Sequence, residues 1–291
     1  MSTCHSEYGT LESVIIKSAQ NAFESQEAID QQWQSLNYLG KPDWNSALDE
    51  SAAFEKALQA TGANTLTLPI ADQVGLDSIY CRDASIATDF GMILCRMGKG
   101  ARDGEPEAQA AFFESMDIPV LGRIESPGTL EGGDVAWLDE KTLAVGHTYR
   151  TNNEGIVQLK ALLEPRGIEV IVAEMPHYKG PSDVFHLMSV LSPVDKDLAV
   201  VYSPLMTIAF RQELLERGFN FVECPEEEFE SMGCNVLATG PRQCLVVEGT
   251  PLTRQRLEAA GCEVRVYQGQ EISQYGCGGP TCLTRPLYRK V

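Results

Sequence analysis

The sequence predicts an α/β fold built from a repeated unit of two strands, a helix and a third strand. Four segments each contain two apolar strands around a turn with Asp, Gly, Pro or Lys, at 78–99, 132–148, 185–204 and 234–249. Good helix formers with helical periodicity follow most of these hairpins, at 105–116, 153–165 and 250–261. A third apolar strand then follows at 118–124, 168–175 and 262–269.

The N-terminal part of the chain fits the same unit, with a strand at 10–18, a helix at 46–62 and a strand at 64–70. Residues 23–44 interrupt the pattern, and we expect them to form an irregular insertion. Because repeats of this length indicate a closed or stacked array, the sequence predicts a single domain over residues 1–291.

One polar or reactive residue recurs at the start of each unit. Asp83, Asp134, His186, Asn235 and Cys282 follow one another at separations of 51, 52, 49 and 47 residues. If the units surround an axis, these five side chains meet in one central pocket. The alternative is that Asp and Asn are common caps at strand starts, and that nine cysteines make one coincidence easy.

The charge balance restricts the partners of the chain. Lys and Arg total 23 against 41 Asp and Glu, a net charge of -18, which disfavours a nucleic acid or an anionic membrane. A small cation would be attracted, although the charge can also serve only solubility. No segment has the roughly 20 apolar residues of a membrane span. A homo-oligomer is compatible with the sequence.

The nine cysteines and the N-terminus favour a reducing compartment. The cysteines are odd in number and lack the paired spacing of a disulfide framework or a structural zinc site. The first residues, MSTCHSEYGT, have neither the basic nor the apolar region of a signal peptide. We therefore expect the protein to be cytoplasmic and to bind no metal.

Cys282 is the candidate nucleophile among these cysteines. It follows the glycine-rich run 276–281, where backbone amides approach closely and lower the pKa of a thiol. A reactive cysteine needs a base or cation nearby, and His186 shares its repeat position at the start of a strand. His5 is expected in a mobile terminus. The alternative for His186 is a structural role.

Carboxylates occupy two further repeat positions. Glu131 and Asp134 flank a pair of glycines before an apolar strand, and Asp83 follows Arg82. Such residues are often solvated turn formers, and Arg82 could neutralise Asp83 locally. If they are buried they need partners, and the planar N–H donors of a guanidinium suit them.

Together the motifs CRD, LEGGDV, FHLMSV and GGPTCLTRPL are similar to those of the guanidino-group-modifying or pentein superfamily. This superfamily includes arginine deiminase, dimethylarginine dimethylaminohydrolase and the amidinotransferases. The resemblance extends from about residue 78 to residue 286. It implies a five-fold pseudosymmetric α/β propeller of ββαβ units around a central active-site channel, and no cofactor.

The resemblance also implies roles for individual residues. Cys282 takes the place of the nucleophile, His186 that of the general acid and base, and Glu131 that of the carboxylate that contacts substrate and His186. Asp83 resembles the aspartate that binds the guanidinium, and Asp134 is expected to bind substrate as well.

The run GHTYRTNNEGI resembles the dimethylarginine hydrolase pattern in which an arginine holds the substrate carboxylate, and Arg150 takes that place. Arg102 is similar to a second such arginine; both could instead be surface residues. Met188 departs from the family, because deiminases have Asp there and dimethylarginine hydrolases typically have Lys. Losing a charge-assisted contact costs about 1.5–3 kcal/mol in binding free arginine, whereas an apolar wall would tolerate an N-alkyl group.

The resemblance thus implies a cysteine-dependent hydrolase acting on the guanidino group of arginine or an N-substituted arginine, giving citrulline and an amine. The expected partner is a small cationic guanidino compound. One alternative is an amidinotransferase, in which an amine rather than water attacks the intermediate. Another is a protein that binds guanidino compounds without turnover.

Overall fold

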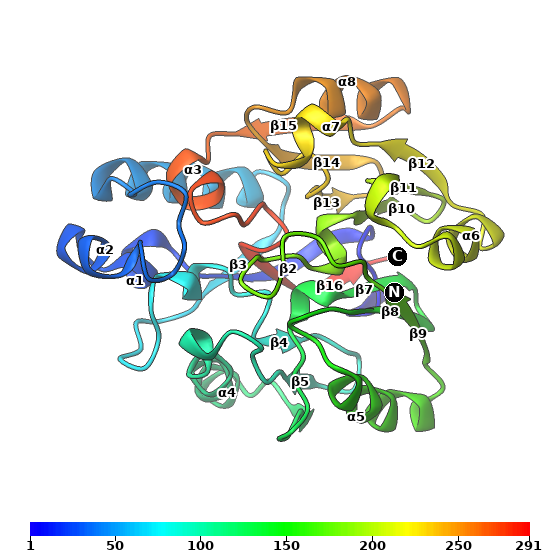
Figure 1. Ribbon diagram of the computed structural model, residues 1–291, viewed down its shortest axis with the longest axis horizontal. Coiled ribbons are helices and arrows are strands. Elements are labelled where there is room, and N and C mark those ends of the chain that lie inside the picture. Colours follow the sequence, from blue (N-terminus) through cyan, green and yellow to red (C-terminus); the bar gives the residue numbers. More distant parts are fainter.

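Five small β-sheets lie around the centre of the computed structural model, which describes residues 1–291 (Figure 1). Four sheets share one order, in which the first two strands are antiparallel and the third is parallel to the second. Their strands are β4 (Ser85–Ile86), β5 (Met92–Leu94) and β6 (Val120–Arg123); β7 (Val135–Asp139), β8 (Thr142–His147) and β9 (Glu169–Glu174); β10 (Leu191–Asp195), β11 (Leu198–Val201) and β12 (Asn220–Glu223); β13 (Leu237–Gly240), β14 (Gln243–Val247) and β15 (Glu263–Tyr267).

The fifth sheet joins the two ends of the chain. β16 (Thr284–Lys290) pairs antiparallel with β2 (Thr10–Ile16), and β2 pairs parallel with β3 (Asn64–Thr67). A two-residue strand, β1 (Ser2–Thr3), adds to the other edge of β16. The C-terminal strand therefore supplies the first strand of the unit that the N-terminal segment begins. The two termini lie close together, to the right of the centre in Figure 1, where the Met1 amino group donates to the Val291 carbonyl oxygen at 3.1 Å.

A helix links the second and third strands of every unit and lies at the periphery in Figure 1. These helices are α3 (Trp44–Gln59), α4 (Glu105–Ser115), α5 (Asn153–Leu163), α6 (Ile208–Glu216) and α8 (Pro251–Ala259). In α5 the side chain of Asn152 caps the first turn by accepting from the Gly155 amide, while Ile156, Leu159 and Leu163 are buried on one face. Such one-sided burial packs each helix against its sheet.

Three shorter α-helices lie elsewhere in the chain, and one of them corrects a prediction. They are α1 (Ala19–Phe23), α2 (Gln26–Gln32) and α7 (Glu226–Phe229). Residues 23–44, predicted as irregular, contain α2. Its first turn is stabilised because the Ser25 side chain accepts from the Ala28 amide, and Ile29 is its one buried residue. Because α2 buries only one residue, its sequence shows little of the apolar periodicity that indicates a helix.

The α/β class and the four hairpins are confirmed, but the prediction for the N-terminus is wrong. His5 is only 3% exposed. Its ring stacks on Trp137 at a centroid distance of 3.9 Å, and its Nδ1 lies 3.0 Å from the carbonyl oxygen of Glu140. The first residues are therefore packed into the structure by polar and aromatic contacts that have no periodic signature.

The strands near the centre are buried on both faces. All four residues of β11, Leu198 to Val201, are buried, as are those of β13. This explains why the sequence shows unbroken apolar runs instead of the alternation of a half-exposed sheet. None of the helices combines the length and the apolar character required to cross a membrane.

Candidate active site

A cavity of about 420 Å³ lies where several units meet. Four of the five residues aligned on the repeat, Asp83, His186, Asn235 and Cys282, line it, and the fifth, Asp134, does not. Each precedes a different first strand, so the repeat brings residues that lie far apart in sequence to one place. His186 itself stands before a short 3₁₀ turn at Leu187–Ser189 and not at the start of β10 as predicted.

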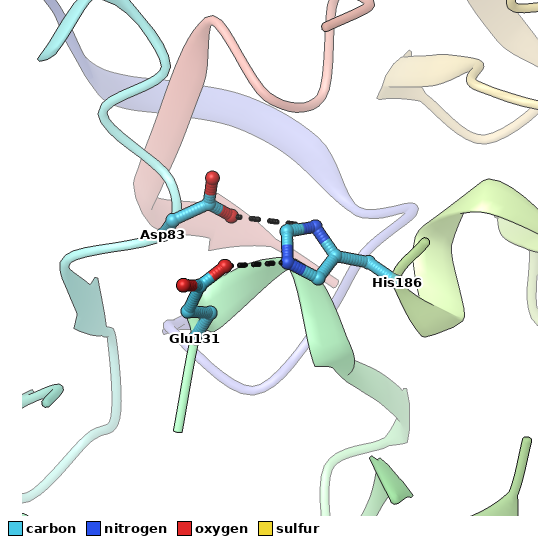
Figure 2. Close-up of side chains that lie close together, drawn as sticks. All are labelled: Asp83, Glu131 and His186. Atoms are coloured by element: carbon cyan, nitrogen blue, oxygen red, sulfur yellow. Dashed lines mark hydrogen bonds and ion pairs between the residues drawn. The ribbon is translucent and has the colours of Figure 1, made fainter. Parts of the chain in front are cut away.

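The His186 ring lies between two carboxylates (Figure 2). Its Nε2 is 2.7 Å from Glu131 Oε2, and its Nδ1 is 3.9 Å from Asp83 Oδ1. Burial alone would lower the pKa of His186, but the negative charges of Asp83 and Asp134 and the hydrogen bond with Glu131 raise it to about 9. Burial likewise opposes ionisation of Glu131, yet the hydrogen bond and charge of His186 hold its pKa well below its usual range.

This raised pKa predicts how the stability of the fold depends on pH. Protonated His186 contributes fully below its ordinary pKa of 6.5, and the contribution is lost as pH rises through about 9. We expect roughly 3 kcal/mol of unfolding free energy to be lost across this window. Urea unfolding of the wild type and of His186→Gln at several pH values would measure it. Equal pH slopes for the two proteins would contradict the expectation.

Glu131 is fully buried and does not line the cavity. Its second oxygen, Oε1, accepts hydrogen bonds from the backbone amides of Gly98 (2.9 Å) and Lys99 (3.0 Å). Both oxygens of Glu131 are therefore engaged inside the protein. The position of this carboxylate suits it to hold His186, whereas contact with a substrate was expected as well.

Asp134 lies behind the cavity, away from the position expected of a substrate-binding residue. It accepts from the hydroxyls of Thr148 (2.7 Å) and Thr151 (2.6 Å), and from the backbone amide of Leu187 (2.9 Å), which follows His186. Burial raises the pKa of Asp134 to about 6 in spite of these bonds. Asp134 is thus placed to fix the backbone beside the histidine.

Gly133, next to Asp134, lets His186 and the carboxylate of Asp83 approach each other. A β-carbon added at Gly133 would overlap the ring of His186 and lie 2.7 Å from Asp83 Oδ1. The paired glycines of the LEGGDV motif therefore have a steric purpose in addition to turn formation. A side chain at Gly133 would force His186 and Asp83 apart.

Cys282 is partly buried and lies beside Asn235. The Asn235 side-chain amide donates to Cys282 Sγ at 3.3 Å, while its oxygen accepts from the Thr281 backbone amide (3.0 Å) and hydroxyl (2.8 Å). Burial, followed by the negative charge of Asp83, raises the pKa of the thiol, and the bonds from Asn235 and Thr281 oppose this effect. The free protein thus disfavours the thiolate until a cation is brought beside it.

The bond from Asn235 leads to a second prediction. A hydrogen bond to a charged group is worth about 1.5–3 kcal/mol, so Asn235→Leu should raise the pKa of Cys282 by about 1–2 units. The pH dependence of alkylation at Cys282, followed by mass spectrometry, would measure the shift. Both chains should carry Cys277→Ala, because Cys277 is the other partly buried thiol. Identical alkylation profiles would rule out this role for Asn235.

Two arginines also line the cavity, but they differ in their partners. Arg102 is buried and donates to Asp83 Oδ2 (2.6 Å), to both oxygens of Glu105 (2.8 Å each) and to the carbonyl oxygen of Tyr80 (2.9 Å). The Arg150 side chain donates only to Glu131, with its Nη1 3.4 Å from both oxygens. Neither is a surface arginine, and Arg150 is the less committed of the two to internal bonds.

The charged groups at the base of the cavity favour a cation as ligand. One ligand atom each of Asp83, Glu131 and His186 lies within 4.8 Å of the others. Glu131 already has protonated His186 as its counter-charge, and one oxygen of Asp83 has Arg102. Asp83 Oδ1 is buried and accepts no hydrogen bond from the protein. The open acceptor of the site is therefore one oxygen of Asp83.

The sequence missed some residues of the site. Asn235 was aligned with the repeat but received no role, and its amide contact with Cys282 has no sequence signal beyond that register. Lys99 and Asp77 line the cavity as an ion pair of 2.6 Å. The alternative prediction that Arg82 neutralises Asp83 locally is wrong, because Arg82 pairs with Glu7 at 2.6 Å.

Known proteins share both the sequence pattern and the fold. The family model "N,N dimethylarginine dimethylhydrolase, eukaryotic" matches residues 18–289. The N(G),N(G)-dimethylarginine dimethylaminohydrolase of Streptomyces coelicolor is 31% identical over 252 residues, covering 85% of this chain and 90% of that protein. The Pseudomonas aeruginosa protein of the same name is 29% identical over 248 residues, with coverage of 85% and 91%.

Solved structures extend the comparison. A cysteine-to-serine mutant of the Pseudomonas aeruginosa protein complexed with citrulline gives a TM-score of 0.77 at 26% identity, covering 96% of this chain and 99% of that chain. An amidinotransferase from Microseira wollei gives a TM-score of 0.81 at 16% identity, with coverage of 99% and 97%. The second likeness concerns the fold alone.

An α/β fold that brings a cysteine, a histidine and carboxylates to one cavity defines a guanidino-group-modifying enzyme of the pentein superfamily. The Pseudomonas and Streptomyces relatives are named dimethylarginine dimethylaminohydrolases, and this chain is an amidine-hydrolysing enzyme. Within the superfamily the chain belongs to the N,N dimethylarginine dimethylhydrolase family.

Proposed function

We propose that the chain hydrolyses the guanidino group of an N-alkylated arginine, giving citrulline and an amine, through a covalent intermediate on Cys282. The observation that carries the proposal is the free oxygen of Asp83. Oδ1 is buried and accepts no hydrogen bond in the protein, its nearest cationic atom being His186 Nδ1 at 3.9 Å, and Asp83 lines the same cavity as Cys282 and His186. A guanidinium N–H is a matched donor for that oxygen and brings the cation beside the thiol.

Substrate binding brings a positive charge that favours ionisation of the Cys282 thiol. Burial and Asp83 keep the pKa of Cys282 raised in the free protein. A guanidinium held by Asp83 would offset the negative charge of that residue and place a positive charge next to the sulfur, which favours the thiolate. The nucleophile is then formed where its target carbon is bound.

The reaction proceeds in two steps. The Cys282 thiolate forms a C–S bond to the central guanidino carbon, the bond from this carbon to the alkylated nitrogen breaks, and protonated His186 gives its proton to the departing amine. Neutral His186 then takes one proton from water, whose oxygen attacks the same carbon. The C–S bond breaks to regenerate the thiolate, and the remaining O–H proton is lost to solvent, where the released amine becomes protonated. The carbon ends as the ureido group of citrulline.

The surroundings of the catalytic groups support an alkylated amino acid as substrate. Met188, at the position where related deiminases carry a second carboxylate, and Phe185 give the cavity apolar walls, so an N-alkyl group is tolerated and free arginine loses a contact. We assign Arg150, which lines the cavity, to the substrate carboxylate. We expect methylated arginines to be turned over at least about 10-fold more efficiently than arginine.

A single substrate panel tests the function. Arginine, its methylated forms, agmatine and guanidinoacetate would be incubated with the protein, and products and protein adducts identified by mass spectrometry. Citrulline and methylamines from methylated arginines support the proposal. Amidino transfer to added glycine would favour the amidinotransferase alternative. Tight binding of every compound without product or adduct would show a binder and overturn the proposal.

Three wider features belong to the same proposal. The five sheets with one strand order support a five-fold pseudosymmetric propeller whose central channel holds the active site. Closure of β16 onto β2 supports a single catalytic domain over residues 1–291. All nine cysteines are free thiols, which supports a reducing, cytoplasmic setting.

A further inference from the structure

A second group of buried charges lies apart from the catalytic cavity. Arg82, Arg285 and Arg289 are at most 4% exposed, and Glu7 is 6% exposed. Arg82 Nη2 pairs with Glu7 Oε1 at 2.6 Å, and Arg285 Nη2 donates to the carbonyl oxygen of Arg82 at 2.6 Å. Arg289 donates to the carbonyl oxygens of Gly9 and Ala238 at 2.8 Å each. We call these four side chains the arginine cluster.

The arginine cluster holds more positive charge than the protein neutralises. Three guanidinium groups share one carboxylate, that of Glu7. Burial, followed by the charge of Arg82, lowers the pKa of Arg285 to about 10, so it stays protonated at neutral pH. Burial also lowers the pKa of Arg289 to about 10. Buried charges without counter-charges are strongly unfavourable, so a further anion would stabilise the fold.

The unpaired donors of the arginine cluster show where such an anion would bind. Nε and Nη1 of Arg82, Nε of Arg285, and Nε and Nη2 of Arg289 have no hydrogen-bond partner and are each exposed by less than 1 Å². These five nitrogens belong to three side chains whose nearby charges include one carboxylate, that of Glu7, which bonds to Arg82 alone. All are donors and none is an acceptor, which suits an anion better than a neutral or cationic ligand.

We propose that the arginine cluster binds a small inorganic anion of the size and charge of chloride. The donors are enclosed, and none of the three arginines lines the catalytic cavity, so a larger organic anion would not reach them. Arg82 and Asp83 are adjacent in sequence but serve the two sites separately. The anion therefore binds outside the catalytic cavity and stabilises the folded protein.

The test compares chloride with a bulky anion at constant ionic strength. Thermal unfolding of the full chain would be followed while sodium isethionate is replaced stepwise by sodium chloride. We expect the midpoint to rise by about 5 °C and to saturate, as for a ligand that binds only the folded state. Crystals soaked in bromide should show an anomalous peak within hydrogen-bonding distance of the cluster arginines.

Matched variants identify the site. Arg289→Met should lose the chloride response, whereas Arg265→Met, at an arginine that pairs only with Glu263 on β15, should keep it. Glu7→Gln removes the carboxylate that competes with the anion for the arginines, so it should increase the stabilisation by chloride. If Arg289→Met fails to fold, this increase is the result that tests the site. The Cys282→Ser chain should respond like the wild type, which separates this proposal from the proposed catalysis. If only water occupies the arginine cluster, the midpoint of thermal unfolding should be the same in both salts and no bromide peak should appear. That result would overturn the proposal.

Discussion

Turnover of every guanidino substrate by Cys282→Ser should fall by about 10⁴-fold or more, and no covalent adduct should form. A serine hydroxyl is far less acidic than a thiol, and the site offers it little activation. His186 is already protonated through Glu131 at neutral pH, so it is a poor base for the hydroxyl in the first step. Steady-state kinetics of the purified variant, with mass spectrometry of the protein, would measure both effects.

The matched control is Cys277→Ser. Cys277 lines the same cavity and is the other partly buried cysteine, but Asn235 bonds to Cys282 and not to it. Burial raises the pKa of Cys277 to about 11. Cys277→Ser should retain turnover within a few-fold of wild type. Substantial turnover by Cys282→Ser, or an adduct on Cys277, would show that the nucleophile has been misassigned.

The regular units of the fold were predictable because each carries its own local signals. The hairpin of β7 and β8 has two apolar runs around a polar turn, and α5 has a cap and one apolar face, all readable within about 30 residues. The pairing of β16 with β2 was not predictable from such signals. It joins residues more than 260 positions apart, and the strand TRPLYRK has no alternation that would mark its partner.

The register of the repeat predicted the place of the site better than the function of each residue. It grouped Asp83, His186, Asn235 and Cys282, which line one cavity. It did not separate Asp134 from them, because the register carries no information on side-chain direction, and this carboxylate accepts from Thr148 and Thr151. Equivalent positions in a repeat fix where a side chain starts, whereas neighbouring residues decide which way it points.

Glu131→Gln should lower kcat by about 10²–10⁴-fold while changing KM much less. The carboxylate bonds to His186 and lies outside the cavity lining, so its loss affects proton transfer more than binding. In the variant, an amide nitrogen facing His186 Nε2 would donate a hydrogen bond and favour the neutral imidazole. The leaving amine would then lack its proton, and the limb of the pH–rate profile that reports His186 should move to lower pH by at least about one unit.

Loss of stability must be separated from this catalytic effect, and Glu228→Gln is the matched control. Glu228 is also a buried carboxylate that accepts two backbone amide bonds, from Leu252 (2.6 Å) and Thr253 (2.7 Å), but it does not line the catalytic cavity. Both variants should lose some stability, and only Glu131→Gln should shift the pH–rate profile. An unshifted profile with kcat near wild type would mean that His186 does not depend on Glu131 for its charge. The charges of Asp83 and Asp134, which also raise the pKa of His186, would then suffice to keep it protonated.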